Sequence, residues 1–128
     1  MEVDYADVTD KKVPEARALA EKGKLSEAID LLMTLEKQTR TGGDMHSTSK
    51  ILVCIVQMCY EAKNWGLLNE HVILLSKKRS QLKASVTKMV QECSQWIFDK
   101  KLPSKEIELK LIETLMTCLL YTSDAADE

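Results

Sequence analysis

The sequence predicts an all-α fold, a right-handed superhelical solenoid of about six helices stacked as hairpins. Only 5% of the 128 residues are aromatic, and the chain contains only four glycines and two prolines. An all-β sandwich or barrel needs more strand-forming and turn-forming residues than this. Apolar residues instead recur at helical spacing, and the pattern restarts about every forty residues, as in stacked helical hairpins.

The first predicted hairpin follows an acidic segment, residues 1–12, which we expect to be flexible. Its first helix is predicted to begin at Pro14, which suits the first helical turn, and to end before Gly23, which suits the position after a helix. A second helix is predicted for residues 24–39, because apolar residues fall at steps of three and four: Leu25, Ala28, Ile29, Leu32 and Leu35. Residues 41–44 (TGGD) are typical of a loop.

The second hairpin contains the most hydrophobic helix, predicted for residues 44–63. Nine of the ten residues from 51 to 60 are apolar, so this helix is expected in the middle of the array with neighbours on most sides. The run is also compatible with a buried strand, but its length and helical flanks favour a helix. Asn64 is the predicted N-cap of a fourth helix over residues 65–79.

The third hairpin has the clearest periodicity. Over residues 80–98, apolar residues recur at steps of four, three, one, three and four: Leu82, Val86, Met89, Val90, Cys93 and Ile97. A sixth helix is predicted after Pro103, with an apolar stripe that no further hairpin of this chain covers: Ile107, Leu111, Ile112, Leu115 and Met116. We expect one helical-repeat region over residues 13–117, with Trp65 and Trp96 filling gaps between stacked hairpins.

Short motifs support the repeat. Residues 23–32 (GKLSEAIDLL) have the small turn and amphipathic helix of a tetratricopeptide-type repeat. Residues 64–70 and 101–104 repeat its turn later in the chain. The sequence therefore predicts tetratricopeptide-like helical hairpins.

The charge balance argues against nucleic-acid and membrane binding. The net charge is −2 and the pI is near 5.8, whereas nucleic-acid binding needs a basic stripe. The nearest basic run is Lys77-Lys78-Arg79, which falls at a predicted helix C-terminus, where cations complement the helix dipole. The longest apolar run is about ten residues, against about twenty for a membrane helix. The acidic start lacks a signal-peptide pattern, so we expect reduced cysteines and a location in cytoplasm and nucleus.

The sequence predicts no metal site and no cofactor. The candidate soft-metal ligands are Cys54, Cys59, Cys93, Cys118, His46 and His71. They form no Cys-x-x-Cys pair, and Cys54 and Cys59 lie about 140° apart around a helix. We expect the cysteines to act as small buried hydrophobic residues.

The sequence also predicts no catalytic residue and no small-molecule substrate. A nucleophile pair of Cys59 and His71 is disfavoured, because burial on an apolar helix raises the pKa of a thiol, and His71 is expected to be partly exposed. The loop at residues 41–44 lacks the Gly-Lys-Ser/Thr pattern of a phosphate-binding loop. Glu106 and Glu108 are expected to lie on a solvated helix face.

Four strings are specific rather than generic helix: LEKQTRT at 35–41, STSKILV at 47–53, MCYEAK at 58–63 and LLSKKRSQLK at 74–83. With the opening MEVDY, they resemble the proteasome non-ATPase regulatory subunit 12 family over about residues 1–117. The resemblance implies a helical solenoid that leads into a C-terminal PCI domain, a winged-helix module for association of lid subunits. We expect the 128 residues not to include that domain.

The function that the resemblance implies is that of a non-catalytic structural scaffold in the lid of the proteasome regulatory particle. Such a subunit supports lid assembly and ubiquitin-dependent protein degradation, with other lid and regulatory-particle subunits as partners. Two alternatives stay open. One is a tetratricopeptide-type adaptor that captures peptides in its concave groove. The other is a subunit of a related PCI complex, such as the signalosome or a translation initiation factor.

Residues 118–128 (CLLYTSDAADE) depart from the family pattern. The codons TGT CTC TTA TAC ACA TCT of a transposon-type sequencing adapter encode the first six of these residues, and the adapter's continuation encodes the rest. We therefore interpret this segment as a non-native, adapter-encoded tail. A natural acidic tail is the alternative.

Overall fold

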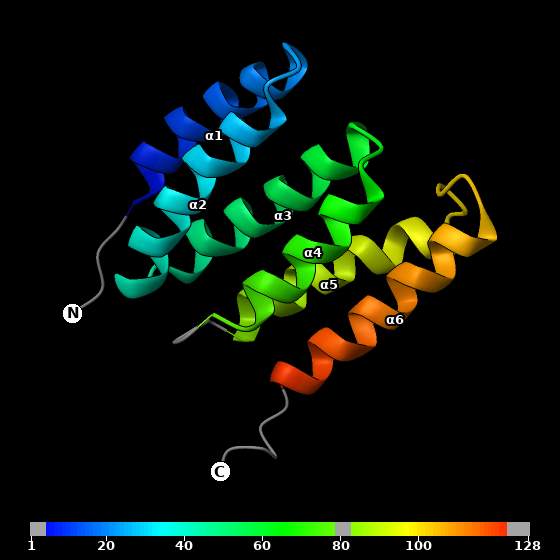
Figure 1. The fold of residues 1–128 in the computed structure, drawn as a ribbon. Helices are drawn as coiled ribbons and strands as arrows, with labels where there is room; N and C mark the ends of the chain where they lie inside the picture. The colour runs from blue at the N-terminus through cyan, green and yellow to red at the C-terminus, as the bar shows by residue number, and fades with distance from the viewer. Residues whose placement is uncertain (1–4, 79–82, 123–128) are drawn as a thin grey trace.

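The computed structural model describes residues 5–78 and 83–122. Residues 121 and 122 are described by their backbone only. Within these ranges it contains six α-helices and no strand, which confirms the all-α fold class. They are α1 (Ala6–Glu21), α2 (Leu25–Thr41), α3 (Met45–Glu61), α4 (Trp65–Ser76), α5 (Lys83–Phe98) and α6 (Lys105–Thr122). Consecutive helices pair as α1–α2, α3–α4 and α5–α6 (Figure 1). The right-handed superhelix stays a prediction.

The hairpins stack through α3. This helix contacts α1 and α2 on one side, its partner α4, and α5 on the other side, while α4 packs on α6. Within the described residues, no contact joins the first hairpin to the third. The predicted central position of the most hydrophobic helix is therefore confirmed. Its buried apolar residues are Ile51, Leu52, Cys54, Ile55, Val56, Met58 and Cys59.

Four of these helices end in the same type of turn. The residue two positions after the helix has a positive φ, and the next N–H donates to the carbonyl five residues back, at 2.9–3.1 Å. Glycine adopts this conformation without strain, as predicted for Gly23. The four φ values are 82° at Gly23, 77° at Gly43, and 57° at both Lys63 and Lys100.

The start of α1 differs from the sequence prediction. The helix begins at Ala6, and Pro14 lies inside it, where the missing N–H removes a helical hydrogen bond at a cost of about 3 kcal/mol. Tertiary packing compensates, because Thr9 and Val13 are buried against the array. Residues 6–12, expected to be flexible, therefore form the first turns of a helix.

Other helix ends lie close to their predictions. α4 ends at Ser76, with Lys77 as its C-cap, and α2 continues to Thr41. Arg79 and Leu82 lie outside the described residues. Asn64 caps α4 as predicted, because its Oδ1 accepts from the Leu67 N–H at 3.1 Å. Among the described residues, no helix combines the length and hydrophobicity needed to cross a membrane.

Asp44 ties the start of the chain to the α2–α3 turn. Its carboxylate accepts hydrogen bonds from the backbone N–H groups of Ser47, at 3.1 Å, and Tyr5, at 2.7 Å. Burial by itself would raise the pKa of Asp44, but these hydrogen bonds outweigh it and leave the pKa below its ordinary value of 3.8. The ionised carboxylate therefore stabilises the folded state.

We expect Asp44→Ala to lower the free energy of unfolding by about 1–2 kcal/mol at neutral pH, because α3 loses its N-cap and Tyr5 loses its acceptor. The folded pKa is depressed, so the charge-dependent part of this contribution is present above the ordinary carboxyl pKa. It is lost as the pH falls through the folded pKa. Urea denaturation over a pH series measures it. Asn64→Ala is the matched control, since it also removes an N-cap but no charge. The charge-dependent part would be contradicted if Asp44→Ala and the parent differed in free energy of unfolding by the same amount at neutral and at acid pH.

Candidate functional site

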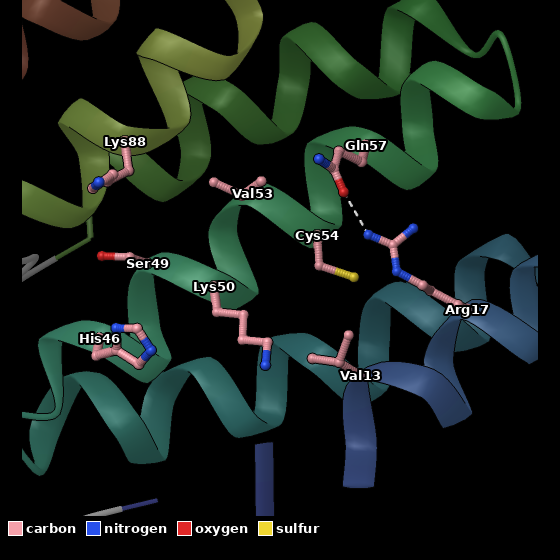
Figure 2. Close-up of a pocket in the computed structure, with 9 residues that line it drawn as sticks. All are labelled: Val13, Arg17, His46, Ser49, Lys50, Val53, Cys54, Gln57 and Lys88. Atoms are coloured by element: carbon pink, nitrogen blue, oxygen red, sulfur yellow. Dashed lines mark hydrogen bonds between the residues drawn. The ribbon is translucent and has the colours of Figure 1, made fainter. Parts of the chain in front are cut away.

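A groove with a volume of about 550 Å³ crosses the face formed by α1, α3 and α5. We call it the three-helix groove (Figure 2). Nine residues line it: Val13, Arg17, His46, Ser49, Lys50, Val53, Cys54, Gln57 and Lys88.

Helical spacing places these residues on one surface. On α3, the lining residues follow at steps of three, one, three, one and three, so they share one face. On α1, Val13 and Arg17 are four residues apart and face the same way. Lys88 reaches the groove from α5. The floor is apolar, because Val13 and Cys54 are buried and Val53 is half-buried.

Three cationic side chains line the three-helix groove. They are those of Arg17, Lys50 and Lys88, and no carboxylate is among its nine lining residues. Three carboxylates lie beside it. Asp10 is 2.7 Å from the Lys50 Nζ, Glu61 is 3.8 Å from the Arg17 guanidinium, and Glu92 accepts a hydrogen bond from the lining residue Gln57. The first two carboxylates form ion pairs. Both pairs are partly exposed, so solvent screens them and each contributes little to stability. The side chain of Lys88 is exposed.

Polar side chains join the three hairpins along this face. The Arg17 guanidinium donates to the Gln57 Oε1, and the Gln57 Nε2 donates to the Glu92 Oε2 at 2.8 Å. The hydroxyls of Ser49 and Ser85 are 2.9 Å apart. These partners are separated by 40, 35 and 36 residues respectively, so they occupy comparable positions in successive hairpins. The contacts agree with the predicted period of about forty residues.

The four cysteines are free, and their burial agrees with the prediction that they act as small buried hydrophobic residues. Burial raises the pKa of Cys54, of Cys93 and of Cys118, and it raises the pKa of Cys59 to about 12. Each thiol is therefore protonated at neutral pH, when it is a poor nucleophile and metal ligand. Within the described ranges, no group of three or more His, Cys, Asp or Glu side chains is placed to hold a metal ion.

His71 was predicted to be partly exposed, but it is buried, with 9% of its surface accessible. Its Nδ1 lies 3.0 Å from the Leu67 carbonyl oxygen of the same helix, which satisfies that ring nitrogen locally.

Glu106 and Glu108 were both predicted to lie on a solvated helix face. The prediction of a solvated position is correct for Glu106, which is exposed. It is wrong for Glu108, whose side chain is only 13% exposed and pairs with Lys100 at 3.8 Å.

Trp96 fills a gap between hairpins, as predicted. Its ring stacks on Tyr60 of α3 with a centroid distance of 4.4 Å and an interplanar angle of 17°. Trp65 meets the same tyrosine edge-on, at 5.8 Å and 63°, but this contact lies within the second hairpin. The place of Trp65 between hairpins therefore stays a prediction.

A second surface, which we call the end face, lies on the third hairpin. Phe98 is 78% exposed and Met116 is 63% exposed. The predicted stripe of α6 is only partly uncovered, because Leu111 and Leu115 are buried where α6 packs into the array. A hollow of about 320 Å³ lies between α5 and α6, lined by Val90, Ser94, Ile97, Phe98, Ile112, Leu115, Met116 and Leu119.

A sequence profile of the family described as PSMD12/CSN4, N-terminal, matches residues 27–118, well over half of the chain. The chain belongs to this family. The match confirms the resemblance found in the sequence, and it runs from α2 into α6. The groove residues of α3 and α5 lie inside the matched region, whereas Val13 and Arg17 of α1 precede it.

Relatives from several organisms agree with this assignment. The chain is 43% identical over 117 residues to the 26S proteasome non-ATPase regulatory subunit 12 of Dictyostelium discoideum, which covers 91% of this chain and 26% of that protein. It is 43% identical over 97 residues to homolog A of that subunit in Arabidopsis thaliana, covering 76% and 22%. It is 33% identical over 112 residues to the 26S proteasome regulatory subunit RPN5 of Saccharomyces cerevisiae, covering 88% and 25%. The chain thus spans about a quarter of the length of these curated relatives.

Proposed function

We propose that this chain is the N-terminal helical part of a subunit of the proteasome regulatory particle lid. In this role it acts as a non-catalytic structural scaffold that supports lid assembly and ubiquitin-dependent protein degradation in cytoplasm and nucleus. Its partners are other lid and regulatory-particle subunits. The observation that carries the proposal is the family match over residues 27–118, together with relatives named as proteasome regulatory subunits.

The architecture supports a scaffold. Stacked hairpins give an elongated array with long outer surfaces, and each hairpin covers the apolar face of its neighbour. The end face leaves Phe98 and Met116 exposed, and an apolar surface of this kind marks a site of association. The four thiols are protonated at neutral pH, which favours structural over catalytic roles for them.

Co-purification of the tagged full-length protein from cell extract tests the lid role. We expect the other lid subunits to be recovered in stoichiometric amounts. Recovery of a signalosome or of a translation initiation factor complex instead would favour the related PCI complex. A soluble monomer that retrieves only peptide ligands or chaperones would contradict the scaffold and support an adaptor.

A further inference from the structure

We propose that the three-helix groove is a docking site for an acidic peptide segment of a partner protein, in which an apolar residue lies between carboxylates. This goes beyond the lid role and does not depend on it, because the groove is formed by this chain alone. The groove combines an apolar floor with cations along its length. The floor fits the apolar residue of such a segment, and the cations fit its carboxylates.

The positions of the cations set the length of the segment. From His46 to Gln57, the α3 wall rises by about 16 Å, at about 1.5 Å per residue. An extended peptide covers that distance with about five residues. Lys88 lies near one end, Lys50 in the middle and Arg17 near the other end (Figure 2). Carboxylates at the two ends of the peptide therefore meet Lys88 and Arg17.

The floor specifies the residue between the carboxylates. Val13 and Val53 project into the groove with the Cys54 thiol beside them (Figure 2). The pKa of that thiol is raised by burial, so the thiol is neutral and contributes an apolar contact. A leucine-sized side chain loses apolar surface to water when it enters this floor.

The existing contacts of the walls leave the cations as the main source of attraction. Ser49 and Gln57 already hydrogen-bond to α5, so they hold the shape of the groove. Lys50 pairs with Asp10 and Arg17 pairs with Glu61, but both pairs are partly exposed, so a peptide carboxylate can replace Asp10 or Glu61 at small cost. The exposed ammonium of Lys88 makes no ion pair with any described residue, so it can receive a carboxylate directly.

The same chemistry does not favour a nucleic acid. Single-stranded nucleic acids are bound by aromatic platforms beside a long cationic track, and none of the lining residues is Phe, Tyr or Trp. An extended polyanion would also place charges beside the carboxylates that flank the groove, those of Asp10, Glu61 and Glu92. A short acidic peptide, by contrast, places its charges only where the groove has cations.

Fluorescence anisotropy with the 128-residue chain tests the proposal. The probe is a fluorescein-labelled heptapeptide, Asp-Glu-Gly-Leu-Gly-Glu-Asp, and the control peptide has lysine at every acidic position. We expect saturable binding of the acidic peptide that weakens as salt is raised. Replacing the leucine of the probe by serine should also weaken binding, because the apolar floor loses its partner.

Variants locate the binding in the groove. Lys88→Glu is expected to raise the Kd about tenfold, and Lys50→Glu is expected to act in the same direction. The matched control is Lys105→Glu, which makes the same charge change at an exposed residue outside the groove and should alter the Kd by less than about twofold. Circular dichroism shows whether each variant keeps its helices. All of the substituted lysines are exposed, so their replacement leaves the core intact.

Several results would overturn the proposal. They are absence of saturable binding, equal weakening by Lys88→Glu and Lys105→Glu, and equal affinity for the lysine peptide or for a single-stranded oligonucleotide. None of these outcomes bears on recovery of lid subunits, so failure here is distinguishable from failure of the proposed lid role.

Discussion

Replacing Glu36 by alanine is expected to lower the free energy of unfolding by about 3–5 kcal/mol, because the change removes one partner of a buried ion pair. The Glu36 side chain is fully buried, and that of Arg40 is 9% exposed. The Arg40 Nε donates to the Glu36 Oε2 at 2.9 Å. Urea denaturation followed by circular dichroism measures the loss.

Two variants separate the ion pair from general effects of substitution in α2. Glu27→Ala, at an exposed position of the same helix, should change stability by less than about 0.5 kcal/mol. Replacing Glu36 by leucine and Arg40 by methionine together should restore most of the loss, because both charges of the buried pair are then replaced by apolar side chains. A loss below about 1 kcal/mol for Glu36→Ala would show that Arg40 finds water or another partner at little cost.

Trp96→Ala is expected to lower the free energy of unfolding by about 3–5 kcal/mol. The indole is only 5% exposed and stacks on Tyr60 across two hairpins, so its removal leaves a cavity at their junction. Thermal and chemical denaturation both report the change. Phe98→Ala is the matched control, since this aromatic residue on the same helix is 78% exposed and should cost less than about 0.5 kcal/mol. Similar losses for the two variants would mean that Phe98 is covered in solution.

Much of the helical order could be predicted because its signals are local. The apolar run of α3 indicated its central place, and the end of α1 and the N-cap of α4 followed from Gly23 and Asn64. The start of α1 could not be predicted, because Pro14 reads locally as a first-turn residue. Packing of the residues before it is a tertiary effect.

Buried polar residues were the weakest part of the prediction. Glu36 was not singled out in the sequence, although it follows Leu32 by four residues and therefore lies on the predicted apolar stripe of α2. Its partner Arg40 is four residues further along the same helix. That spacing is the signal that could have identified the pair. His71 was misplaced for a similar reason, since its hydrogen bond to its own helix permits burial.

The three-helix groove was not predicted, because no stretch of sequence contains it. Its walls come from three helices, and Arg17 and Lys88 are far apart in the chain. The repeat period offers a signal, since Arg17 and Gln57 are 40 residues apart and touch. Aligning the successive repeats would have placed Arg17, Lys50 and Lys88 each on the first helix of its hairpin. The directions of their side chains still depend on how the hairpins stack.

The absence of contacts between the first and third hairpins, among the described residues, has a mechanical consequence. The separation of α1 from α5 is set through the second hairpin, by two successive stacking angles. A small rotation at either junction changes the width of the groove while each hairpin keeps its own core. The curvature of the array and the occupancy of the groove are therefore coupled. If a ligand binds in the groove, bending of the array changes its affinity, and by thermodynamic reciprocity the bound ligand biases the curvature of the array.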